Sequence, residues 1–136
     1  MVVRSKELRY IRTEDDIAIL RTSVKRIVAL LNFGPVSQTK VVTAASELAR
    51  NVFEHGKGGL VEIELLDETD KVGLRMIFVD EGDGISDVTR ALEDGYSTTN
   101  GMGLGLGGAK RLMDEFHIES NGGGTRVSVT KWDLKA

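Results

Sequence analysis

Residues 72–85, VGLRMIFV followed by DEGDGI, decide how this chain folds. The first eight residues are apolar at all but two positions, which is typical of a central strand that is covered on both faces. Asp80 then stands where the strand ends, and the chain turns on Gly82 and Gly84. The sequence therefore predicts a carboxylate at the end of a buried strand, beside backbone that a ligand can approach closely.

Further strands are predicted on both sides of this segment. In residues 61–65 apolar side chains alternate with Glu62 and Glu64, so one face of that strand is expected to be exposed to water. The remaining parts of the expected sheet are a strand at 8–12, a turn at 67–71, and a closing hairpin made of 117–120, the turn 121–124 and 125–131.

Three helices are predicted from apolar residues at helical spacing. The first follows a capping box at residues 13–16 and ends before Gly34-Pro35, the second covers 37–54, and the third covers 109–116. Helices and strands that each have one apolar face imply an α+β class protein. We expect a two-layer α/β sandwich, with a mostly antiparallel mixed sheet and the helices on one face, in a single domain over residues 1–136.

Composition excludes several classes of function. The chain has 136 residues, a net charge of −3 and no cysteine. The mild acidity and the lack of a basic stripe argue against nucleic-acid binding, and the lack of cysteine excludes disulfides, thiol nucleophiles and zinc–thiolate sites. No segment approaches the roughly 20 apolar residues of a membrane span, and the first residues lack the apolar core of a signal peptide. We therefore expect a cytoplasmic protein.

Glycine is concentrated in the second half, where eleven of the sixteen glycines lie between Gly82 and Gly124. The run from Gly101 to Gly108 leads into the third helix, and backbone N–H groups on such a turn can cradle phosphates. A dinucleotide-binding loop would follow a strand, and a Walker A loop would contain Gly-Lys-Ser/Thr; neither condition is met. A flexible linker explains neither the helix that starts inside the run nor its apolar residues.

The second helix carries a polar stripe of Glu47, Asn51 and His55, spaced four residues apart. A glutamate there can accept a proton from a hydroxyl group, and an asparagine oxygen is a suitable magnesium ligand. The alternative is that Glu47 only pairs with Arg50 or Lys40 on the surface.

Asp80 also has alternatives. A carboxylate at this point can accept a hydrogen bond from an exocyclic amine, with a planar ring above the glycines, or it can belong to a simple acidic turn. A calcium loop requires oxygen ligands at alternate positions and a glutamate at the twelfth. Counted from Asp80, the third residue is Gly82 and the twelfth is Ala91, so the calcium loop is excluded.

The order and separation of these motifs resemble the four sequence boxes of the GHKL ATPase superfamily, whose nucleotide-binding unit is the Bergerat fold. The boxes are Glu47-Leu48-Ala49-Arg50-Asn51, Asp80-x-Gly82-x-Gly84-Ile85, Gly101-x-Gly103-x-Gly105-Leu106 and Gly124-Thr125. The resemblance implies that ATP and Mg²⁺ are the cofactors. It implies the following roles: Glu47 as general base, Asn51 as nucleotide and Mg²⁺ ligand, Asp80 on the adenine amine, and Gly82, Gly84, Ile85, Thr98, Gly101, Gly103, Gly105, Leu106 and Thr125 as nucleotide-binding residues.

Within that superfamily, the chain resembles the small serine/threonine kinases of partner-switching systems of the RsbT type. Neither a phosphoacceptor-histidine dimerisation segment nor a transducer domain is expected. The resemblance implies phosphorylation of STAS-domain antagonist or scaffold proteins (RsbS- and RsbR-like), followed by activation of an RsbU-like phosphatase. The alternatives are an anti-sigma factor that sequesters a sigma factor, and an ATP-binding module without transfer activity.

Overall fold

The computed structural model describes residues 1–82, 97–99, 102–103 and 106–135. The sequence pattern also favours a further short helix around residues 87–93, and these residues lie outside the described part of the chain. The elements in chain order are β1 (Val2–Ile11), α1 (Glu14–Leu30), α2 (Pro35–Glu54), β2 (Gly59–Asp67), β3 (Lys71–Asp80), β4 (Ser97–Thr99), β5 (Met102–Gly103), α4 (Leu106–Leu112), β6 (Glu115–Asn121) and β7 (Gly124–Leu134).

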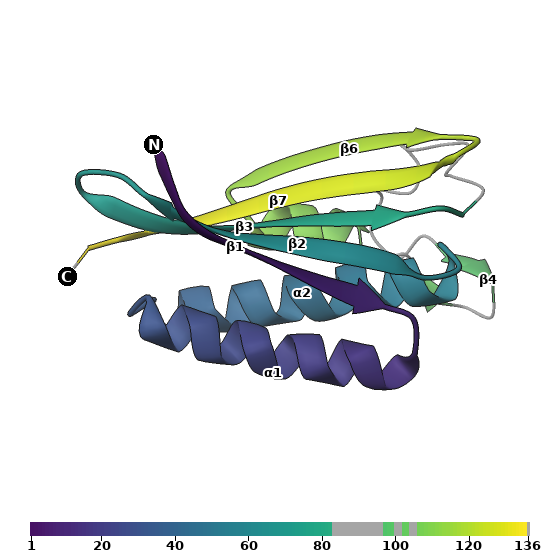
Figure 1. The fold of residues 1–136 in the computed structure, drawn as a ribbon, viewed down its shortest axis with the longest axis horizontal. Helices are drawn as coiled ribbons and strands as arrows, with labels where there is room; N and C mark the ends of the chain where they lie inside the picture. The colour runs from purple at the N-terminus through teal and green to yellow at the C-terminus, as the bar shows by residue number, and fades with distance from the viewer. Residues whose placement is uncertain (83–96, 100–101, 104–105, 136) are drawn as a thin grey trace.

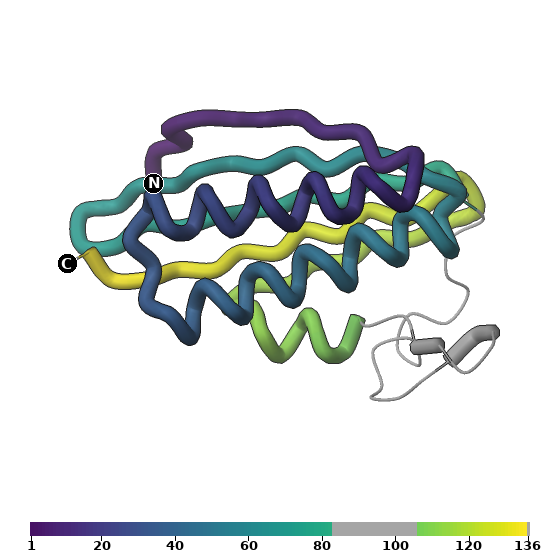
Figure 2. The backbone as a smooth tube through the Cα atoms, turned by 90° about the horizontal axis from the view of Figure 1, so that it is seen from below, coloured from purple at the N-terminus to yellow at the C-terminus, as the bar shows by residue number. Residues whose placement is uncertain are grey.

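The molecule has two layers, a five-stranded sheet and a layer of helices against one of its faces (Figure 1). The strand order is β1-β2-β3-β7-β6, and every neighbouring pair in this sheet is antiparallel. Seen from the helical side, α2 runs between α1 and α4 (Figure 2). The predicted sandwich is therefore confirmed, and the described five-stranded sheet is antiparallel throughout rather than mixed.

The core forms between the helical stripes and the inner face of the sheet. Thr13 caps α1 in a capping box with Asp16, as the sequence predicts. The apolar stripe that predicts α2 is buried throughout, with Leu48 only 1% exposed; it consists of Val41, Ala45, Leu48 and Val52. Phe78 of β3 is equally buried in the same cluster. Burial of each large apolar side chain contributes about 1.5–3 kcal/mol, so this buried cluster holds α2 against the sheet.

Two predicted boundaries were wrong. The first strand is longer than residues 8–12 and begins at Val2. The third helix starts earlier and ends at Leu112, so Phe116 lies in β6 rather than in the helix. Helix α4 ends where Asp114 donates its backbone N–H to the carbonyl of Thr130 (2.9 Å), because pairing with β7 begins there.

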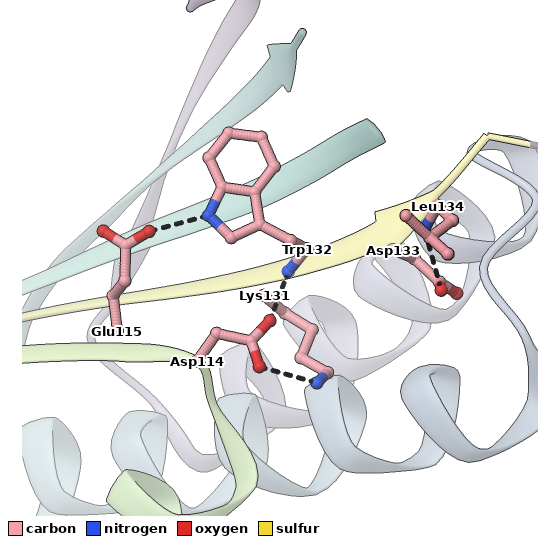
Figure 3. A network of polar contacts seen from close by, with 6 residues as sticks. All are labelled: Asp114, Glu115, Lys131, Trp132, Asp133 and Leu134. Atoms are coloured by element: carbon pink, nitrogen blue, oxygen red, sulfur yellow. Dashed lines mark hydrogen bonds and ion pairs between the residues drawn. The ribbon is translucent and has the colours of Figure 1, made fainter. Parts of the chain in front are cut away.

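The helices α1, α2 and α4 all lie against the inner face of the sheet, and on the outer face of β3 a side chain of the neighbouring strand β7 covers the backbone. The ring of Trp132 packs directly on Gly73, where an added Cβ would lie 2.7 Å from the ring. Its indole N–H bonds to Glu115, and its backbone N–H bonds to the carboxylate of Asp114 (Figure 3). Glu64 lies on the face away from the core, as its alternation with Val61 and Ile63 predicts, but it is only 4% exposed; its carboxylate accepts a hydrogen bond from Arg75 at 2.5 Å.

Candidate functional site

Asp80 is the last residue of β3, and its carboxylate is held by backbone groups of two other segments. Oδ1 accepts hydrogen bonds from the N–H of Gly82 (3.0 Å) and the N–H of Thr125 (3.2 Å). Burial raises the pKa of the Asp80 carboxyl, and these two hydrogen bonds oppose the rise without cancelling it. The second oxygen of a half-buried carboxylate can therefore accept a hydrogen bond from a ligand.

Thr125 is the register partner of Asp80 across the β3–β7 ladder. Its hydroxyl lies 2.9 Å from the hydroxyl of Ser120 on β6, and Thr125 is only 8% exposed. The structure thus brings Thr125 beside Asp80, as expected. Ser120 was missed by the sequence prediction because only the β6–β7 register places it in this row.

Gly56 is the second residue that the sequence analysis missed. It follows α2 and lies directly over the Asp80 side chain, where an added Cβ would be 2.4 Å from the carboxylate carbon. A Cβ on Gly82 would lie 2.9 Å from the Cα of Gly56, and one on Gly124 would lie 2.1 Å from the carbonyl oxygen of Asp80. The sequence pattern places His55 on the polar stripe of the second helix and predicts no role for Gly56.

The polar stripe of α2 runs toward the end of the helix that leads to Gly56. Glu47 is exposed, whereas Asn51 and His55 are half-buried. Arg50 pairs with Glu54 at 3.2 Å, one turn further along the helix. Residues 47 and 51 are one turn apart, so their side chains project from the same side of α2. A solvent-exposed carboxylate and a half-buried amide therefore lie on one side of α2.

The described part of the glycine-rich region forms a short hairpin followed by a helix. Thr98 lies in β4 and Gly103 in β5, which pair with each other, and Figure 1 shows β4 at the end of the molecule where α2 ends. Helix α4 starts at Leu106, inside the glycine run and three residues earlier than the predicted boundary. Leu106 is 2% exposed and its side chain belongs to the core, so only its backbone is left to contact a ligand. Gly84, Ile85, Gly101 and Gly105 lie outside the described residues.

The charged groups limit the kinds of metal site. Within residues 1–82 and 106–135, no three His, Asp or Glu side chains gather as a group that could hold a metal ion. Magnesium usually keeps one or two protein ligands and takes the others from phosphates and water. The amide of Asn51 fits that pattern, so this part of the chain suits a magnesium ion carried by a nucleotide.

The helices that the structure describes are all too short or too polar to cross a membrane.

Comparison with known proteins identifies the family. Residues 12–131 match the model of the histidine kinase-like ATPase domain. The chain is 44% identical over 123 residues to the serine/threonine-protein kinase RsbT of Bacillus subtilis (strain 168), covering 90% of this chain and 92% of that protein. It is 30% identical over 133 residues to the anti-sigma F factor of Thermoanaerobacter sp. (strain X514), covering 93% and 92%.

Solved structures share the fold at lower identity. The structure of the RsbU and RsbW domains of Rv1364c from Mycobacterium tuberculosis superposes with a TM-score of 0.65 at 22% identity, covering 96% of this chain and 32% of that one. The catalytic domain of histidine kinase ThkA gives a TM-score of 0.54 at 15% identity, covering 92% and 95%. The arrangement of sheet and helices is therefore that of the Bergerat fold.

Proposed function

Because the chain belongs to the histidine kinase-like ATPase family and, within it, to the RsbT-type serine/threonine-protein kinases, we propose that it phosphorylates a serine or threonine of a STAS-domain antagonist protein. The observation that supports this most directly is 44% identity over 90% of the chain, together with a half-buried carboxylate at Asp80. Residues 1–136 act as one kinase domain. The protein works in the cytoplasm, where ATP is supplied.

In this proposal Asp80 binds the adenine base. Its ionised carboxylate accepts a hydrogen bond from the exocyclic amine, and the backbone at Gly82 and Gly84 lies against the ring. Thr125 supports this arrangement by donating its N–H to Oδ1. Thr98, Gly101, Gly103, Gly105, Ile85 and Leu106 are proposed to complete the nucleotide site.

The phosphates are proposed to lie along α2, beside Asn51 and Glu47. A magnesium ion bound by Asn51 and the phosphates would offset negative charge on the transferring group. Backbone N–H groups of the glycine-rich segment orient the phosphates, and their dipoles stabilise charge that develops during transfer. Glu47, exposed on the same side of α2, accepts the proton of the substrate hydroxyl.

Phosphorylation also gives a reason for partner release. A phosphoserine or phosphothreonine adds about −1.5 to −2 charges to the partner. The kinase has a net charge of −3, so the product complex is repelled where the two surfaces meet. The released kinase would then bind and activate an RsbU-like phosphatase, with RsbS- and RsbR-like proteins as the antagonist and scaffold.

Transfer of radiolabelled phosphate from ATP to a purified STAS-domain protein tests the proposal. Replacing the general base costs typically about 10²–10⁴-fold in rate, so Glu47→Ala should transfer phosphate at least about a hundredfold more slowly while it still binds ATP. Glu54→Gln, on the same helix, is the matched control and should retain the wild-type rate. A Glu47→Ala protein with full activity would refute the assignment of the base.

An anti-sigma factor is the second candidate, favoured by 30% identity over 93% of the chain to the anti-sigma F factor. Affinity capture with the full chain separates the two functions. Recovery of STAS-domain proteins and a phosphatase supports the switch kinase, whereas recovery of a sigma factor supports the alternative. Binding of ATP without any transfer would leave the third possibility, a nucleotide-binding module.

A further inference from the structure

Three chain segments meet at Asp80 with almost no side chain between them. They are the end of α2 at Gly56, the end of β3 at Gly82, and the start of β7 at Gly124. At each of these glycines an added Cβ would come within 3.0 Å of Asp80 or of Gly56. Real Cβ atoms do not make such contacts, so a side chain here forces one of the segments to move.

Gly56 connects the two halves of the proposed nucleotide site. Its N–H donates to the carbonyl of Asn51 (3.0 Å), the same carbonyl that accepts from His55 (2.9 Å). On its other side, Gly56 contacts the Asp80 side chain. The path from Asn51 to Asp80 therefore consists of one hydrogen bond and one van der Waals contact, both made by Gly56.

From this geometry we infer that Gly56 is a positioning residue for adenine recognition: it fixes the Asp80 carboxylate relative to Asn51 because it has no side chain. The inference rests on the proposed function, since it assumes that Asp80 binds the adenine amine. Gly56 touches no ligand in this account. It acts through the orientation of Asp80, and it is buried.

Gly56→Ala is a clean probe of this role. Gly56 does not have a positive φ, so alanine introduces no backbone strain, whereas Gly124 has a φ of +137° and would be strained by any side chain. The methyl group that this substitution adds would displace the Asp80 carboxylate from its position beside the adenine base. Gly122→Ala is the matched control, because a Cβ there meets nothing within 4 Å.

Two nucleotides are compared by isothermal titration calorimetry, ATP and purine riboside triphosphate, which lacks the 6-amino group. Wild type and Gly122→Ala should prefer ATP. In Gly56→Ala the affinity for ATP should fall about ten- to a hundredfold, which corresponds to loss of a hydrogen bond to a charged group. Affinity for the analogue should be unchanged, so that the preference disappears.

The possible outcomes separate the two proposals. If wild type binds ATP without preferring it over the analogue, the role of Asp80 in the proposed function is wrong. If wild type discriminates and Gly56→Ala does so equally well, the positioning role is wrong. A variant that loses affinity for both nucleotides equally also overturns the inference, because the defect then does not act through the 6-amino group.

A stability cycle covers the case in which Gly56→Ala folds poorly. A Cβ added at Gly56 would lie 2.4–2.6 Å from side-chain atoms of Asp80, so removing that side chain should remove the conflict. Circular dichroism melts of Gly56→Ala, Asp80→Gly and the double variant test this. We expect Gly56→Ala to lower the Tm of the wild type and to have little effect in the Asp80→Gly background. Equal losses in both backgrounds would contradict the inference.

Discussion

At the residue scale, the function proposed for Asp80 carries a cost to the fold. A carboxylate that accepts a hydrogen bond from a ligand amine has to be partly withdrawn from water. Burial disfavours the charged form of Asp80 and therefore raises its pKa. Backbone N–H groups of Gly82 and Thr125 offset only part of that cost. The shape of the site therefore accommodates a charge that the unliganded protein would be more stable without.

We expect Asp80→Asn to stabilise the unliganded protein at pH 7 while weakening ATP binding. The pKa of Asp80 is raised on folding, so this group reduces stability as pH rises through its titration, and the reduction is complete above the folded pKa. Asparagine keeps an oxygen that can accept from both N–H groups. The Tm should rise by roughly 1–3 °C at pH 7, a small effect for a half-buried group.

Thermal melts at several pH values check the sign. The advantage of Asp80→Asn should shrink as pH falls below the ordinary aspartate pKa, where both residues are uncharged. Calorimetry should show ATP affinity about ten- to a hundredfold lower. A Tm at pH 7 below that of the wild type would contradict the argument from burial.

At the scale of the elements, α2 begins without a capping side chain of its own. Its N-cap is Gly34, and its first turn contains no acidic residue. The carboxylate of Asp133 in β7 compensates by accepting the Gly34 N–H at 2.7 Å, across 99 residues of sequence. A negative charge at this end also interacts favourably with the helix dipole. The start of α2 is thus fixed by the last strand of the sheet.

Asp133→Ala should lower the free energy of unfolding by about 1 kcal/mol, the usual contribution of an N-cap interaction. Asp133→Asn keeps an acceptor and should lose less. Urea denaturation followed by circular dichroism measures both. Asp70→Ala, an exposed turn residue, is the control, and its effect should stay within about 0.5 kcal/mol. Equal stability of Asp133→Ala and wild type would show that the bond to Gly34 contributes nothing.

The elements also show which features sequence patterns can predict. Capping at Thr13 and the apolar stripe of α2 are local patterns, and both predictions are confirmed. The helix boundary before Phe116 depends on the pairing of β6 with β7. The burial of Glu64 depends on its hydrogen bond with Arg75 on the neighbouring strand. Neither contact is local in sequence. In the site, the motifs single out Asp80 and Thr125, which the structure places opposite each other in the β3–β7 ladder, and their role in nucleotide binding stays a prediction. Gly56 was missed because its proposed role depends on contact with the Asp80 side chain, 24 residues away in sequence, which has no local signature.

At the scale of the whole molecule, the one tryptophan lies far from the proposed nucleotide site. Trp132 is paired with Gly73, seven residues before Asp80 along β3, which corresponds to roughly 23 Å at the rise of a strand. Its ring packs on the outer face, between Lys71 and the sheet, whereas the helices cover the inner face. Its fluorescence therefore reports unfolding of the sheet and should be insensitive to ligand contact.

Tryptophan fluorescence can accordingly measure coupling between ATP binding and the stability of the entire fold. At about a hundred times its Kd, a ligand that binds only the folded state adds about 2.7 kcal/mol. For a chain of this length, that corresponds to a rise in Tm of roughly 5–10 °C. The folded-state emission should stay unchanged, and Asp80→Asn should show a much smaller shift at the same ATP concentration. An emission change on ATP addition at 25 °C would mean that the nucleotide alters the sheet at its far end. If ATP raised the Tm of Asp80→Asn as much as that of the wild type, Asp80 would make no contribution to ATP binding.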